Sequence, residues 1–228
     1  MFDKLRYGGV IMDKIVPAFE ASLLEPVFSS ILDIGEVGID SLLDEGLFKD
    51  IPIVGLVMGV GKTAQNIHDR NLLKQTLKFI QTFNEKIISE SKLQKYKKKI
   101  EQDPKKAEDE LGRVLIILNN TVEIKKSELL GKIFRAYVDE RIVWEQFGEL
   151  SEAITRLFIS DIYLLHEIFD RKINDSTQCM NYQVDRLVSI GFVNTTTKSM
   201  TIGSNNSSNT ERYLNVSEFG RLFCNVTV

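Results

Sequence analysis

The chain has 228 residues, 43% of them hydrophobic and 27% charged, which is the composition of a globular protein able to bury a core. Only four prolines and 14 glycines interrupt it, so long helices are favoured over a fold of many turns. The N-terminal residues carry acids and no long apolar run, which argues against a signal peptide. Two cysteines, Cys179 and Cys224, lack CxxC spacing, which favours two reduced thiols over a disulfide.

The net charge of −3 is unevenly distributed along the chain. Residues 1–60 contain 4 Lys or Arg against 10 Asp or Glu, a balance of −6, whereas residues 61–106 contain 12 against 5, a balance of +7. Residues 176–228 contain 4 against 3. This asymmetry fits pairing within or between chains, an anionic partner for the basic part, or two solvated helix faces.

Residues 1–61 make up a first region that is apolar but interrupted by residues that end helices. These residues are Pro17, Pro26, Gly35, Gly38, Gly46 and Pro52. We therefore expect irregular, short helices here, over residues 18–32 and 37–47.

Residues 62–175 are predicted to form an amphipathic helical bundle. Leu73, Leu77, Ile80, Phe83 and Ile87 recur at helical spacing and give the first helix one apolar stripe. The Asp103–Pro104 pair predicts an N-cap followed by a first-turn proline, Ser127 is a candidate cap for the next helix, and a last long helix is expected over residues 145–170. The inward positions expected on these helices are Leu111, Val114, Leu115 and Leu118; Leu130, Ile133, Phe134 and Tyr137; and Phe147, Leu150, Ile154, Leu157, Phe158, Leu165 and Ile168.

In residues 176–228 the helical spacing of apolar residues gives way to shorter elements, whose order resembles a winged-helix ending. Residues 182–190 read as a helix that Gly191 would end. Phe192, Val193 and a polar stretch follow, and then two short candidate strands at 199–202 and 212–216 with a polar loop at 203–210 between them. Ser217 would cap a final helix. The predicted fold is therefore mainly α, with irregular apolar N-terminal helices, a helical bundle and a small winged-helix-like α+β module. Such modules bind nucleic acids, proteins or small ligands, so the fold alone leaves their role open.

The stretch from Gly55 to Thr63 only superficially resembles a phosphate-binding loop. That motif requires a glycine five residues before the Gly-Lys-Ser/Thr end, and here that position is Leu56. The motif also follows a buried strand of an α/β sheet, whereas Pro52 interrupts the only candidate strand here. We therefore exclude a phosphate-binding loop.

The same stretch has a second interpretation, because residues 51–61 contain no charge. Gly55 and Gly59 would lie on one helix face and allow another helix to approach closely. The run is too short to span a bilayer alone, but several copies in an oligomer could surround a pore. The candidate oligomerisation or membrane residues are Ile53, Gly55, Val57, Gly59 and Gly61. The alternative is a helix buried in the protein's own core.

A lysine-rich segment is the candidate site for an anion or oligonucleotide. It consists of Lys92, Lys95, Lys97, Lys98, Lys99, Lys105 and Lys106. Clustered ammonium groups with Tyr96 among them could hold phosphates or anionic lipid heads, and the alternative is a solvated helix face.

Catalytic and metal-binding patterns are absent from the sequence. His68 and His166 are the only histidines, and no HxxxH, CxxC or HExxH spacing occurs. Asp139 and Glu140 are adjacent, so they point to different helix faces. We expect a protein that is not an enzyme and that needs no cofactor or metal.

Three segments resemble a group of bacterial helical proteins, namely LLDEGLFKDIPIVGLVMGVGKTAQNIHDRNLLKQTLKFIQTF (42–83), LLGKIFRAYVDERI (129–142) and LSEAITRLFISDI (150–162). The closing LNVSEFGRLF (214–223) is similar to the end of the Abi-alpha type abortive-infection proteins. The resemblance implies bacterial anti-phage defence, with the membrane effector of the two-gene Hailong system as one such setting. It also implies an oligonucleotide ligand made by a partner nucleotidyltransferase.

The leading hypothesis from the sequence is a defence effector that forms a homo-oligomer and acts on the bacterial inner membrane as a channel or pore, under control of a nucleotide or oligonucleotide. Its expected location is the cytoplasmic side of that membrane, or the cytoplasm before activation. The alternatives are a soluble winged-helix regulator that binds nucleic acid and a cytosolic scaffold.

Overall fold

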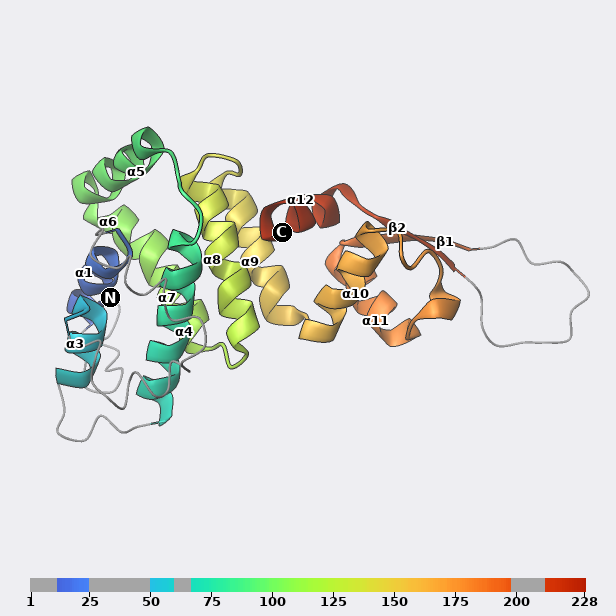
Figure 1. Ribbon diagram of the computed structural model, residues 1–228, viewed down its shortest axis with the longest axis horizontal. Coiled ribbons are helices and arrows are strands. Elements are labelled where there is room, and N and C mark those ends of the chain that lie inside the picture. The colour runs from blue at the N-terminus through green and yellow to red at the C-terminus, as the bar shows by residue number, and fades with distance from the viewer. Residues whose placement is uncertain (1–11, 25–49, 60–66, 198–211) are drawn as a thin grey trace, which may run out of the picture. The chain divides into compact units, whose positions relative to one another are not determined.

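A computed structural model describes residues 12–24, 50–59, 67–197 and 212–228 (Figure 1). The protein is mainly helical with one small antiparallel sheet near its C-terminus, so the predicted fold class is confirmed. The chain divides into two compact units, residues 1–144 and 145–228, which we describe one at a time. The division at residues 61 and 175 stays a sequence-based prediction.

The elements of the first unit are α1 (Met12–Leu24), α3 (Pro52–Gly59), α4 (Ile67–Asn84), α5 (Glu90–Gln102), α6 (Pro104–Ala107), the π-helical turn η2 (Glu108–Gly112), α7 (Arg113–Asn119) and α8 (Ile124–Val138). Those of the second unit are α9 (Trp144–Arg156, which begins one residue before the unit), α10 (Ile159–Phe169), the 3-10 turn η3 (Ser176–Gln178), α11 (Asn181–Ile190), β1 (Val193–Thr197), β2 (Arg212–Val216) and α12 (Glu218–Thr227).

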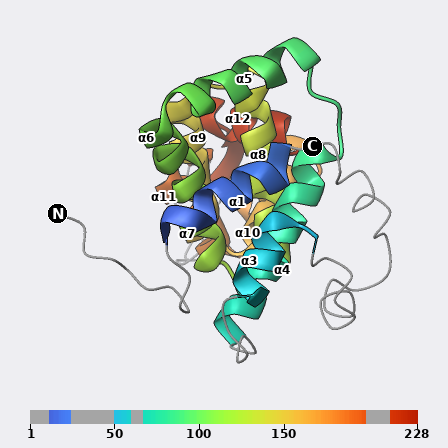
Figure 2. The same ribbon diagram turned by 90° about the vertical axis from the view of Figure 1, so that its left-hand side faces the viewer.

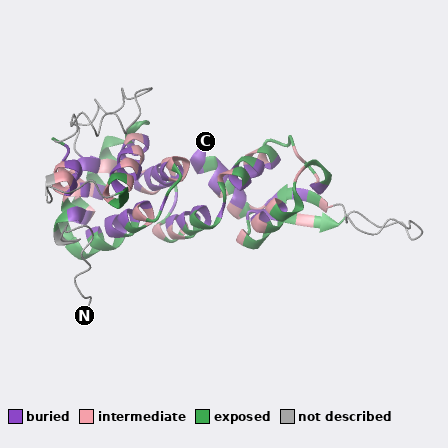
Figure 3. Cartoon of the chain, turned by 90° about the horizontal axis from the view of Figure 1, so that it is seen from below, coloured by how far each residue is buried: buried purple, intermediate pink, exposed green. Residues whose placement is uncertain are grey.

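Helices α4 and α8 form the centre of the first unit, and every residue of α8 is buried or half-buried. Figure 3 shows the burial along the chain. Packed aromatic rings connect α1, α4 and α8. The ring centres of Phe19 and Phe79 are 5.8 Å apart, and that of Phe134 lies 5.6 Å from Phe79 and 5.8 Å from Phe83. The predicted stripe on α4 is buried through Phe83, but Ile87 is fully exposed because α4 ends at Asn84. The core is thus built from rings that interlock at tilted angles.

Polar groups also cross the α4–α8 contact. The Ser127 hydroxyl, which is fully buried, donates to Gln75 Oε1 at 2.6 Å, and Gln75 Nε2 donates to the Val122 carbonyl at 2.8 Å. The prediction that Ser127 caps the helix is wrong: α8 begins at Ile124 with Glu123 as its N-cap. Ser127 serves as a buried link between the two helices.

The Asp103–Pro104 start is confirmed, and the Asp103 carboxylate accepts from the Lys106 N–H at 3.2 Å. The helix that follows is not uniform, because it passes through the π-turn η2 before continuing as α7. Its predicted inward residues are all buried, namely Leu111, Val114, Leu115 and Leu118.

The N-terminal helices differ from the expectation. Helix α1 begins at Met12 and contains Pro17, which the sequence analysis placed at a break. Pro17 is exposed. Helices α1 and α3 lie side by side against α4 (Figure 2). The helix expected at 37–47 lies outside the described residues.

The predicted single helix over residues 145–170 is wrong, because α9 ends at Arg156 and α10 begins at Ile159. The cause is Asp161, whose buried carboxylate accepts from the Phe158 N–H at 3.0 Å and starts a new helix there. Phe158 has an extended backbone and is 59% exposed, although the pattern placed it inside.

The second unit contains helix, strand, strand and helix in the expected order, but its first strand, β1, lies at Val193–Thr197, where the sequence pattern indicated a polar stretch. Strands β1 and β2 pair antiparallel, with Val193 opposite Val216 and Thr197 opposite Arg212. Gly191 ends α11 at φ +86°, and Ser217 Oγ caps α12 by accepting from the Gly220 N–H at 3.0 Å. The predicted strand 199–202 and the loop 203–210 lie outside the described residues.

Gly131 on α8 is required by the close approach of α4. A Cβ at this position would lie 2.9 Å from the Phe79 carbonyl oxygen and 3.1 Å from Thr82 Cβ. We expect Gly131→Ala to lower stability by about 1–3 kcal/mol, seen as a lower midpoint of thermal unfolding by circular dichroism. Gly112→Ala is the matched control, because its Cβ would lie 3.8 Å from Val16 Cγ2 in ordinary contact. An equal loss in both variants would contradict this explanation.

Candidate anion-binding site

A groove on α5 and α6 collects four of the seven predicted lysines. It has a volume of about 610 Å³. The residues that line it are Ser91, Gln94, Lys95, Lys98, Lys99, Gln102, Asp103 and Lys106. Positions 91, 94, 95, 98 and 102 lie on one side of an α-helix because they are spaced by three or four residues. The Asp103–Pro104 junction then adds Lys106 from α6.

Three of the seven lysines form ion pairs inside the first unit. Lys92 Nζ lies 3.0 Å from Asp139 Oδ1, Lys95 Nζ lies 2.5 Å from Glu140 Oε1, and Lys99 Nζ lies 2.7 Å from Glu110 Oε1. The hydrogen bond from Lys95 is the main reason that the pKa of Glu140 is lowered. All three lysines are on α5, and two of their partners follow α8 directly, so these contacts fasten α5 to the end of α8.

The other four lysines, Lys97, Lys98, Lys105 and Lys106, form no ion pair within the described part of the chain. Lys98 and Lys106 are exposed and line the groove, whereas Lys97 and Lys105 do not line it. Asp103 is the only acidic residue in the lining, and its side chain caps α6. Within the groove, the unpaired positive charge available to an external anion is therefore that of Lys98 and Lys106.

Beneath the groove, Lys99 reaches a buried polar cluster. Glu110 is 2% exposed, and its Oε1 accepts from Lys99 Nζ at 2.7 Å and from the Tyr137 hydroxyl at 2.9 Å. The Lys99 ammonium also hydrogen-bonds the Tyr137 hydroxyl and lies over the Tyr96 and Tyr137 rings, 5.5 and 4.9 Å from their centres. Glu110 Oε2 and the Tyr96 hydroxyl are buried without a hydrogen-bond partner among the described residues.

Burial, followed by the nearby Glu110 charge, raises the pKa of Tyr96 well above its ordinary value. Sequence reasoning missed Glu110 and Tyr137 as members of this site. Glu110 lies in the π-turn η2, which shifts the helix register in a way that no residue pattern announces. The only available signal was Tyr96 within the lysine run.

The candidate membrane residues on α3 are largely packed inside the first unit. Ile53 is fully buried, Val57 is 3% exposed and Gly55 is half-buried. The Ile53 N–H donates to Ser22 Oγ of α1 at 3.0 Å. Gly59 is the last residue of α3, and Gly61 lies outside the described residues. Among the helices that the structure describes, none has the length and apolar character needed to cross a bilayer.

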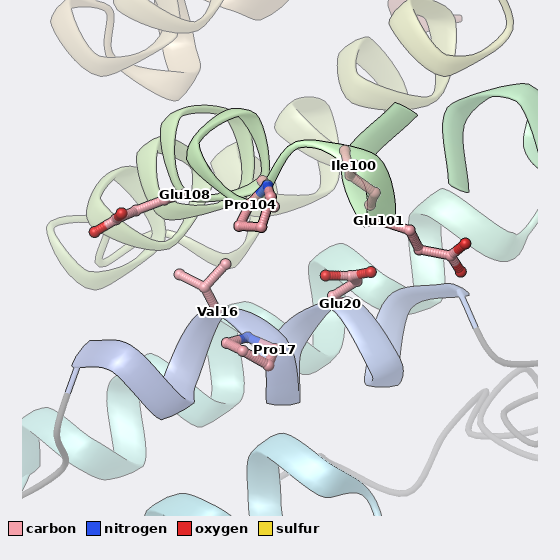
Figure 4. Close-up of a pocket in the computed structure, with 8 residues that line it drawn as sticks. Val16, Pro17, Glu20, Ile100, Glu101, Pro104 and Glu108 are labelled. Atoms are coloured by element: carbon pink, nitrogen blue, oxygen red, sulfur yellow. The ribbon is translucent and has the colours of Figure 1, made fainter. Parts of the chain in front are cut away.

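A second hollow, of about 420 Å³, lies between α1 and the α5–α6 region and carries acidic rather than basic side chains. Glu20 of α1 and Glu101 of α5 face each other at one end, and Glu108 lies at the other end (Figure 4). Val16, Pro17, Ile100, Pro104 and Ala107 complete the lining. Burial, with repulsion from Glu101, raises the pKa of Glu20. A carboxyl with a raised pKa is easier to protonate in the folded state, so its ionisation lowers stability as pH rises through that pKa.

Replacing Glu20 by Gln removes this ionisation. We expect Glu20→Gln to raise the midpoint of thermal unfolding at neutral pH, with the gain disappearing as the pH falls below the pKa of Glu20. Glu108→Gln, at the opposite end of the hollow, should leave the midpoint unchanged and serves as the control. A lower midpoint for Glu20→Gln at neutral pH would show that the Glu20 charge is stabilising.

In the second unit, the basic side chains on and beside α11 are already paired. Arg186 binds the fully buried Asp161 through bonds of 2.8 and 2.6 Å and stacks between Phe158 and Tyr182. Arg212 Nη1 lies 2.7 Å from Asp185 Oδ1. The helix expected to read nucleic acid therefore offers little free positive charge.

Burial raises the pKa of Cys224 to about 12, and burial also raises that of Cys179, so neither thiol is activated. Both cysteines are free. Within the described residues, no group of three or more His, Cys, Asp or Glu side chains is placed to hold a metal ion. Comparison with protein-family models, curated proteins and solved structures found no match.

Proposed function

We propose that this chain is a non-catalytic effector of anti-phage defence whose activity is set by a nucleotide or oligonucleotide bound in the α5–α6 groove. The observation that carries the proposal is the placement of Lys98 and Lys106 in one groove, without ion pairs to other described residues. Phosphates favour such a site because each one that is neutralised releases condensed cations.

The lining of the groove also defines the kind of recognition. Ser91, Gln94 and Gln102 can hydrogen-bond phosphate oxygens, and no aromatic side chain is among the lining residues on which a base could stack. Contacts to phosphates position a ligand without reading its sequence. The ligand class is therefore a short chain of phosphates whose base identity matters little.

The resemblance to abortive-infection proteins supports defence as the biological setting and the inner membrane as the place of action. Helix α3 is the segment for that step, because none of its eight residues is charged. Its side chains Ile53 and Val57 are buried, so α3 has to leave α1 and α4 before it meets lipid or a second copy of the chain.

The soluble nucleic-acid regulator has less support. Residues 145–228 contain 7 Lys or Arg against 10 Asp or Glu, a balance of −3. Since phosphate neutralisation supplies most non-specific affinity for nucleic acid, a module of this charge is poorly suited to duplex DNA.

The groove is tested by fluorescence anisotropy with a labelled short oligothymidylate over a series of salt concentrations. The wild-type affinity should fall steeply as the salt concentration rises. The double variant Lys98→Glu, Lys106→Glu should bind at least about tenfold more weakly. Its salt slope, the slope of log affinity against log salt concentration, should be smaller by about 1.4, or 0.7 for each lost phosphate contact. Lys97→Glu with Lys105→Glu makes the same charge change outside the groove and is the matched control. Equal losses in the two variants, or binding insensitive to salt, would refute a groove-specific site.

The membrane step is tested with anionic liposomes, with and without the oligothymidylate. The wild type should pellet with the vesicles and release entrapped dye in one of the two ligand states. Gly55→Leu with Gly59→Leu should abolish release because bulky side chains prevent close helix contact. Met58→Leu, an apolar exchange on the same helix, should retain release. Failure of the wild type to pellet or leak in either state would eliminate action on membranes.

A further inference from the structure

Lys99 belongs to two sites at once. Its side chain lines the α5–α6 groove and is 31% exposed, yet its ammonium bonds the buried Glu110 and Tyr137. An ammonium has three N–H donors, and two of them are used in the buried cluster. The positive charge that Lys99 could offer to a phosphate is therefore already largely neutralised by Glu110.

Glu110 depends strongly on this contact. It is 2% exposed, one of its oxygens has no hydrogen-bond partner among the described residues, and Lys99 forms its only ion pair there. Removing the counter-ion of a buried charge is strongly destabilising, so Glu110 holds Lys99 firmly. A ligand that drew Lys99 into the groove would leave this carboxylate unpaired.

We infer that Glu110 acts as an internal competitor for the Lys99 ammonium and so keeps the affinity of the groove for phosphates low, an inference that rests on the proposed function. A phosphate in the groove and the Glu110 carboxylate compete for the same donor, the Lys99 ammonium. The groove then binds as a site of Lys98 and Lys106, because Glu110 pairs with Lys99 and Glu140 pairs with Lys95. A phosphate that draws the Lys99 ammonium into the groove removes it from Glu110, and so changes the contacts of the π-turn η2 and of Tyr96.

Glu110→Gln is the variant that separates charge from shape. Glutamine retains the oxygen that accepts from Lys99 and Tyr137, and it removes the negative charge. Its amide also brings a donor toward the buried Tyr96 hydroxyl, which now lacks a partner among the described residues. The variant is therefore expected to fold, and the circular dichroism spectrum checks this.

We expect Glu110→Gln to bind the labelled oligothymidylate about tenfold more tightly than the wild type, with a salt slope steeper by about 0.7, because one more phosphate contact is made. Adding Lys99→Gln to that variant should remove the whole gain. A purely structural role for Glu110 would not steepen the salt slope. Unchanged or weaker binding by Glu110→Gln, alongside normal wild-type binding, overturns the inference.

A measurement without ligand tells the two proposals apart. The rate at which an amine reagent modifies Lys99, read by peptide mass spectrometry with Lys98 as internal reference, should rise in Glu110→Gln because the ammonium is released. An unchanged rate overturns the inference even where the groove binds oligonucleotide. A faster rate with no binding by the wild type or any variant overturns the proposed function and supports the hold of Glu110 on Lys99.

Discussion

Gly131 allows α8 to come within van der Waals contact of α4, and the geometry of the first unit follows from that approach. The ring of Phe134 can then meet both Phe79 and Phe83, which fixes the direction of α8 in the core. That direction brings Asp139 and Glu140, just beyond the end of α8, to the lysines of α5. A residue without a side chain thus determines where a charged helix is fastened.

The lysine-rich segment combines two groups of lysines with different roles. Lys92 and Lys95 form ion pairs with Asp139 and Glu140, whereas Lys98 and Lys106 stay available in the groove for an external anion. Lys99 lies between these groups because it belongs to both the groove and the buried cluster. The high density of lysines is therefore not itself a measure of ligand affinity, because structure and recognition draw on the same residues.

The sequence was sufficient for most of the fold and for the lysine-rich segment, four of whose seven lysines line the groove. The errors have identifiable physical causes. Period and capping rules found α4, the Asp103 start, α11 with Gly191, and the Ser217 cap, because each depends on neighbours in the chain. The break at Phe158 depends on the hydrogen bond from the Phe158 N–H to the Asp161 carboxylate, and the apolar pattern runs through this break without interruption. The division of the lysines could not be predicted either, since Glu110 and Glu140 are 11 and 45 residues from their partners.

Helix α5 buries only Tyr96 and Ile100 among its 13 residues, whereas α4 buries nine of 18. An element with few buried apolar side chains opens locally at a lower free energy than one with many. The amide hydrogens of α5 would then exchange with solvent sooner than those of α4, and ionic strength would control that opening. Because the Tyr96 ring packs against that of Phe134, with 5.9 Å between their centres, the middle of α5 stays with the aromatic core and the turns on either side open first.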